Sequence, residues 1–195
     1  MKYLILFILF PLCIQSQEIH IESKMDSETA FESDLKAFEN IVYYKFDFVS
    51  DQENNLHFQI IEKEFVQGIL SREEVYFDSK NIPEQLLSNT VSVSLVSKYT
   101  SSENYKLMMR FYNIFSMIKN FELEEKNQHS FKIFINKNQK FQLNTSYLFA
   151  GIIKPIKINE NTYRNCDFNT ALDKYEQWYD VFGLDHYSIY EIKFY

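Results

Sequence analysis

The chain has 195 residues, with 27 acidic and 20 basic side chains and a formal net charge of −7. This length suits a single domain with a hydrophobic core of its own. The acidic balance argues against a general nucleic-acid binder, because phosphate contacts need clustered cations. We therefore expect no nucleic-acid partner.

The first sixteen residues have the pattern of a signal peptide. A single lysine precedes an almost wholly apolar run over residues 3–14, which is too short to cross a bilayer. Ser16 places a small residue before a cleavage point, so we expect residues 1–16 to be removed and the protein to be periplasmic or extracellular. The residues before Cys13 make a poor lipidation motif, so we expect no lipid anchor there and no membrane span after cleavage.

Removal of the leader would leave Cys166 as the one cysteine of the mature chain. No internal disulfide could then form, and the fold would depend on its hydrophobic core. We expect a short lead over residues 17–26, followed by a single domain over residues 27–195.

The periodicity of the first half predicts one helix and then a run of strands. Apolar residues at i, i+4 and i+7 predict a helix over residues 27–39, capped by Asp26 or Ser27. Alternating apolar residues predict strands over 41–48, 56–65, 69–77 and 90–99.

Residues 101–119 fit two structures. The TSSE pattern at 100–103 resembles a capping box, and apolar residues between 108 and 118 recur at helical spacing. These features predict a helix. The alternating residues that begin at Leu107 leave a hairpin with the preceding strand as the alternative.

The remaining elements complete an α+β fold. Strands are expected over 130–136, 140–144 and 146–158, with an interruption near Pro155. The best helix signal is NTALDKYEQWYDVFG at 169–183, which ends on a C-terminal glycine, and a last strand follows over 188–195. This order predicts a single domain with a largely antiparallel β-sheet and about three helices packed against it.

Motifs for catalysis or cofactor binding are almost absent. The chain has no glycine-rich phosphate loop, no nucleophile elbow and no metal-ligand spacing among its four histidines, so we expect no cofactor or metal. Cys166 and His186 flank the last predicted helix and are the one candidate nucleophile–base pair. A helix of about 13 residues would hold them roughly 20 Å apart, which is beyond hydrogen-bond reach. Neighbouring acids such as Glu62 and Glu64 are expected to be solvated surface charges.

Charge is segregated along the chain. Residues 18–89 carry 16 acidic and 6 basic side chains, whereas residues 126–164 carry seven basic and one acidic. The basic segment is either a set of solvated strand edges or a patch for an anionic or glycan ligand. The candidate ligand-binding residues are Lys132, Lys137, Lys140, Lys154, Lys157 and the outward-facing aromatic Tyr43.

The sequence therefore predicts a small exported protein with a non-catalytic binding or interaction role. The expected partner is an unidentified protein or an anionic or glycan ligand. The alternative is an exported hydrolase whose site is assembled from dispersed residues.

Overall fold

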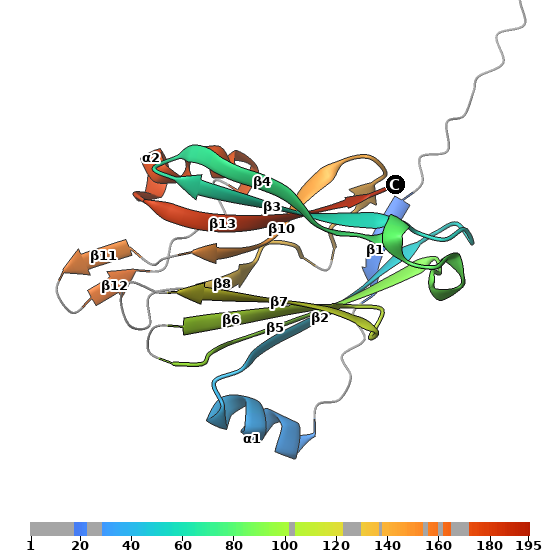
Figure 1. Ribbon diagram of the computed structural model, residues 1–195, viewed down its shortest axis with the longest axis horizontal. Helices are drawn as coiled ribbons and strands as arrows, with labels where there is room; N and C mark the ends of the chain where they lie inside the picture. The colour runs from blue at the N-terminus through green and yellow to red at the C-terminus, as the bar shows by residue number, and fades with distance from the viewer. Residues whose placement is uncertain are drawn as a thin grey trace, which may run out of the picture.

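The computed structural model describes residues 18–22, 29–101, 104–122, 130–136, 138–153, 156–159, 162–164 and 172–195. Two antiparallel sheets face each other and enclose one hydrophobic core (Figure 1). The described residues are mostly β, with 57% in strands and 17% in helices.

Sheet A has the strand order β7-β6-β5-β2-β1-β9. Its strands are β1 Glu18–Glu22, β2 Val42–Ser50, β5 Thr90–Tyr99, β6 Asn104–Phe111, β7 Phe115–Glu122 and β9 Phe141–Gln142. Strand β1 pairs with both β2 and β9, so residues 18–22 of the expected lead over 17–26 join the sheet.

Sheet B has the strand order β4-β3-β13-β10-β8. Its strands are β3 Phe58–Val66, β4 Ile69–Asp78, β8 Ser130–Ile133, β10 Ser146–Ile153 and β13 His186–Phe194. Strands β11 Ile156–Asn159 and β12 Thr162–Arg164 form a separate two-stranded ribbon.

The predicted α+β fold with about three packed helices is wrong. The described residues contain two α-helices, α1 Ala30–Phe38 and α2 Trp178–Phe182, and three short 3₁₀ turns. These turns are η1 Ser79–Asn81, η2 Glu84–Leu86 and η4 Leu172–Gln177. None of these helices is long and apolar enough to span a bilayer.

The helix expected over residues 101–119 is wrong, because the described residues 104–122 form the hairpin β6–β7, and β6 pairs with β5 as the alternative had it. Leu107 and Met109 are fully buried on the inner face of β6, and the strand pairs with β5 on one side and β7 on the other. Tyr112 and Asn113 take left-handed conformations that reverse the chain. Burial of the alternating residues between two strand partners outweighs the helical pattern of the same segment.

The last predicted helix is also mostly absent. Within its described part, residues 172–177 form a 3₁₀ turn that is kinked at Lys174, and only the five residues of α2 are α-helical. Gly183 ends α2 in a left-handed conformation, as its C-terminal position predicts.

The predicted strands and their inner faces are largely confirmed. Val93 in β5 and Ile192 in β13 are fully buried, and so are their alternating neighbours. Phe48 lies at the centre of the core, where its ring centroid is 5.2 Å from that of Phe194 and 5.4 Å from that of Phe141. A smaller second core lies on the outer face of sheet B, where Trp178 is fully buried.

Candidate functional site

Helix α1 is capped at both ends by local residues. The Glu32 N–H donates to Thr29 Oγ1 at 3.2 Å, and the Thr29 N–H donates to a Glu32 carboxylate oxygen at 2.9 Å, which makes a capping box. Asn40 follows the helix with a φ of 50°, and the Ile41 N–H donates to the Lys36 carbonyl at 2.8 Å. This pattern is a Schellman motif.

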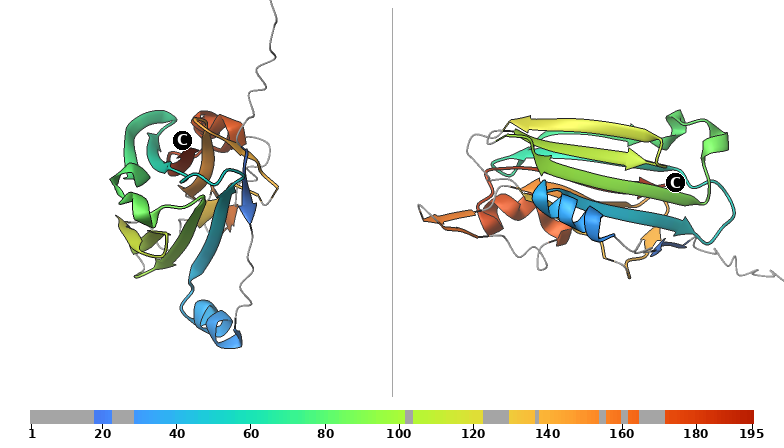
Figure 2. Two further views of the ribbon diagram at one scale, coloured as in Figure 1. Left: turned by 90° about the vertical axis from the view of Figure 1, so that its right-hand side faces the viewer. Right: turned by 90° about the horizontal axis from the view of Figure 1, so that it is seen from below.

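The apolar stripe of α1 faces solvent. No residue of the helix is buried, and Phe31, Leu35 and Phe38 are 74%, 45% and 82% exposed. The helix stands beside the two sheets, at the start of β2, without packing into the core between them (Figures 1 and 2). Exposed apolar groups that gather in this way mark interaction surfaces.

The start of β2, which follows α1 in the chain, is also exposed. Val42 is still 37% exposed, whereas Phe48 is fully buried. The strand therefore enters the core only in its second half. We call the α1 surface the set of exposed residues Phe31, Leu35, Phe38, Val42, Tyr43 and Tyr44.

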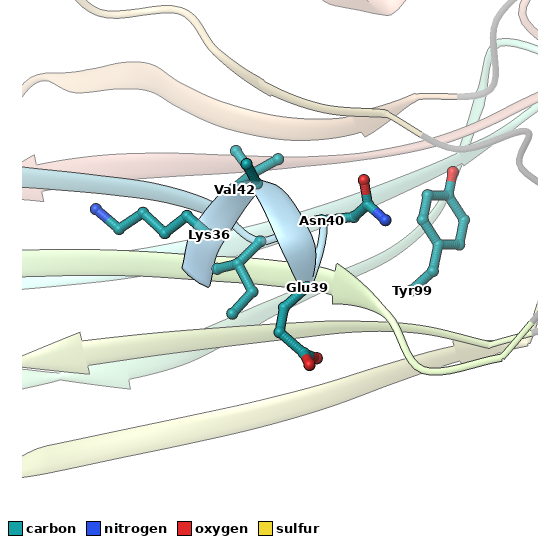
Figure 3. A pocket seen from close by; sticks show the side chains of 7 residues that line it. Lys36, Glu39, Asn40, Val42 and Tyr99 are labelled. Atoms are coloured by element: carbon teal, nitrogen blue, oxygen red, sulfur yellow. The ribbon is translucent and has the colours of Figure 1, made fainter. Parts of the chain in front are cut away.

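A hollow of about 670 Å³ lies between the end of α1 and sheet A (Figure 3). Lys36, Glu39 and Tyr99 contribute to its walls. Lys36 Nζ lies 4.4 Å from the centroid of the Tyr43 ring, and Glu39 forms an ion pair with Lys98 at 2.9 Å. These contacts connect α1 to β2 and β5 without covering its apolar stripe.

A second polar feature is a cluster around Glu62, inside the molecule. Glu62 was expected to be a solvated surface acid, yet it has no exposed surface. It accepts hydrogen bonds from Tyr190 Oη at 2.9 Å and from Arg72 at 3.2 Å, and it forms an ion pair with Lys119. Because Lys119 comes from β7, the pair links sheet A to sheet B.

This cluster holds its tyrosines in the neutral form. Burial, reinforced by the Glu62 carboxylate, raises the pKa of Tyr190 well above its usual value. The same two causes raise the pKa of Tyr76 to about 12. Since Glu62 is fully buried and already has three partners, it joins the sheets and is not accessible to a substrate.

A chain of contacts resembles the nucleophile, base and carboxylate of a catalytic triad, and it consists of Ser79, His57 and Glu84. Ser79 Oγ is 3.4 Å from His57 Nδ1, and His57 Nε2 is 3.5 Å from Glu84. However, Ser79 is fully buried and accepts a hydrogen bond from the Phe58 N–H at 2.8 Å. A nucleophile must reach its substrate, so we interpret Ser79 as a structural residue.

The predicted catalytic candidates are only partly described. His186 is exposed at the start of β13, and its Nε2 lies 2.8 Å from Glu64. Cys166 and Cys13 lie outside the described residues. The described residues contain no group of three or more histidine, cysteine and acidic side chains that could hold a metal ion.

The predicted basic candidates lie in different described elements or outside the described residues. Lys132 lies in β8, and the exposed Lys140 forms an ion pair with Glu18 at 2.6 Å. Lys157 lies in the β11 ribbon, whereas Lys137 and Lys154 are outside the described residues. Tyr43 is 40% exposed and belongs to the α1 surface.

Comparison of the chain with protein-family models, with curated proteins and with solved structures found no match.

Proposed function

We propose that this is an exported, non-catalytic binding protein that docks helix α1 into an apolar groove of a protein partner. The observation that carries the proposal is a helix, capped at both ends, whose complete apolar stripe is exposed. Export is supported by the leader-like pattern of residues 1–16.

The spacing of the exposed residues suits recognition by a groove. Phe31, Leu35 and Phe38 stand at i, i+4 and i+7, which is the set of anchors that an amphipathic helix presents to a partner. Full burial of a phenylalanine or leucine side chain is worth about 1.5–3 kcal/mol. Two phenylalanines that are mostly exposed in the free protein therefore leave enough apolar surface for a specific contact.

The charges of α1 indicate the chemistry of the partner. The helix carries Glu32 and Asp34 against Lys36, and Lys36 is directed to the Tyr43 ring. An acidic helix is best matched by a groove whose rim is basic. Acidic charge also disfavours an anionic lipid surface, which attracts basic segments.

The experiment measures capture of host proteins by the immobilised mature protein. The test variant is Phe31→Ala with Phe38→Ala, and the matched control is Ile69→Ala, which removes an apolar side chain that is 72% exposed on β4. A captured protein is then purified and titrated. We expect the double variant to weaken its binding about 30-fold, equivalent to about 2 kcal/mol, and the control to leave it unchanged.

A synthetic peptide of residues 29–39 should compete for the same partner. The proposal is overturned if the double variant binds every captured protein as well as wild type. Vesicle binding or self-association that depends on Phe31 and Phe38 would also overturn it, because the surface would then have another occupant. Amino-terminal sequencing of the native protein tests export, and a start at Met1 would contradict it.

A further inference from the structure

We propose that a separate groove on the outer face of sheet B binds a neutral saccharide. The groove encloses about 440 Å³ and is lined by side chains that include Phe134, Asn136, Gln139, Tyr147, Tyr175 and Glu176. Its volume falls in the range of about 300–1,000 Å³ that is typical of small-molecule sites. None of these residues belongs to the α1 surface.

The aromatic walls of the groove are fixed by the second core. The ring of Phe134 lies 5.3 Å from that of Trp178, and the ring of Tyr175 lies 5.9 Å from that of Phe65. Trp178 is fully buried and is the only tryptophan of the chain. These contacts hold Phe134 and Tyr175 in place before any ligand arrives, which lowers the entropic cost of binding.

One wall of the groove is an ordered polar triangle. Tyr175 Oη donates to Glu191 at 2.6 Å, and Lys63 Nζ lies 3.0 Å from Glu191 and 3.1 Å from Tyr175 Oη. Glu191 lines the groove and is only 5% exposed. Its charge is therefore balanced by Lys63, and its position is fixed.

Other polar groups of the groove have hydrogen-bonding capacity left. The Asn136 side-chain oxygen accepts from the Asn138 N–H at 3.0 Å, so its amide hydrogens are left to donate. Tyr147 Oη accepts from the Gln142 N–H at 2.8 Å and keeps its own hydrogen. Gln139 adds a second amide, which can both donate and accept.

This combination selects a hydroxyl-rich ligand without negative charge. Sugar hydroxyls donate and accept, so they match planar amides and phenols, while the C–H face of a sugar ring packs on aromatic rings. The described lining residues include two carboxylates, Glu176 and Glu191, and no cation. Lys63 is already paired with Glu191, so Glu176 leaves the described lining residues with a negative charge that disfavours an anionic ligand.

The test uses the fluorescence of Trp178, because this side chain contacts Phe134 at the groove wall. The mature protein is titrated with tetrasaccharides of chitin, cellulose and starch, and with an acidic oligogalacturonate for comparison, and calorimetry is run in parallel. We expect a saturable change with at least one neutral sugar and a weaker response to the acidic one.

Gln139→Ala should weaken binding about fivefold, as loss of about one hydrogen bond predicts. The matched control Gln85→Ala changes an exposed glutamine of η2 and should have no effect.

Three results would overturn the proposal: no response to any neutral sugar at millimolar concentration, a preference for the acidic sugar, or equal binding by Gln139→Ala and wild type. Phe31→Ala with Phe38→Ala should leave sugar binding intact. Failure of this proposal is thereby distinguishable from failure of the α1 docking proposal.

Discussion

At the scale of single residues, Glu62 shows how a sequence pattern can mislead. Its neighbourhood in the sequence is rich in charge, so a solvated surface acid was the natural expectation. Yet Glu62 follows Phe58 and Ile60 in the alternation of β3, and all three are fully buried on the inner face. The period of two places the carboxylate in the interior. What the sequence could not supply is its partners, since Tyr190 and Lys119 come from strands far away in the chain.

We predict that Glu62→Ala destabilises the protein by about 3 kcal/mol, because Tyr190 Oη would lose its buried acceptor and Lys119 its counter-ion. Denaturation in urea at neutral pH measures the change. Glu74→Ala is the control, because Glu74 is 46% exposed and its contact with Arg72 is 3.6 Å. The control should cost less than about 1 kcal/mol. Equal losses in the two variants would contradict a buried anchor at Glu62.

At the scale of elements, most of the strands were predictable and most of the helices were not. Strand β5 occupies residues 90–99 as expected, because its alternating pattern and its burial agree. Helix α1 was predictable as a helix from its spacing, whereas its cap was expected at Asp26 or Ser27 and is Thr29. That it would stay uncovered was not predictable, because an apolar stripe looks the same whether a core or a partner covers it. The hairpin over 104–122 was only the alternative to a helix, because its strand partners are fixed by tertiary contacts.

We predict that Thr29→Ala loosens α1 without weakening the rest of the fold. Loss of an N-cap costs about 1 kcal/mol, and a nine-residue helix is marginal without outside support. Amide hydrogen exchange in residues 32–38 should therefore become faster, while the urea midpoint of the whole protein stays unchanged. Thr100→Ala, outside any helix, is the control and should leave exchange in α1 unaltered. A clear fall in the midpoint for Thr29→Ala would mean that α1 supports the core after all.

At the scale of the whole molecule, the prediction of an α+β fold depended on interpreting residues 101–119 and 169–183 as helices. Without those helices, the predicted strands lead to two facing sheets, because strands that alternate on one face need a second apolar layer. The order β7-β6-β5-β2-β1-β9 could not be derived, since it brings β9 from late in the chain beside β1. Pairings between strands so far apart in the sequence depend on tertiary packing, and no local pattern encodes them.

Tertiary packing also determines the pKa values of the buried tyrosines. Burial raises the pKa of Tyr105 and Tyr187 to about 12, and it raises the pKa of five other described tyrosines. These five are Tyr76, Tyr112, Tyr175, Tyr190 and Tyr195. The fold binds these protons more tightly than the unfolded chain does. The resulting stability is therefore complete below pH 10 and is lost as the pH rises toward 12.

We predict that a spectrophotometric titration of the native protein shows a late phase above pH 10. The seven tyrosines whose pKa is raised should ionise in this phase, together with loss of the β-sheet circular dichroism signal. In guanidinium chloride, all tyrosines should titrate in one step near pH 10, which serves as the control. A single step near pH 10 in native buffer, with the circular dichroism unchanged, would mean that these hydroxyls reach water in the folded protein. The two sheets would then be packed less tightly than their buried tyrosines imply.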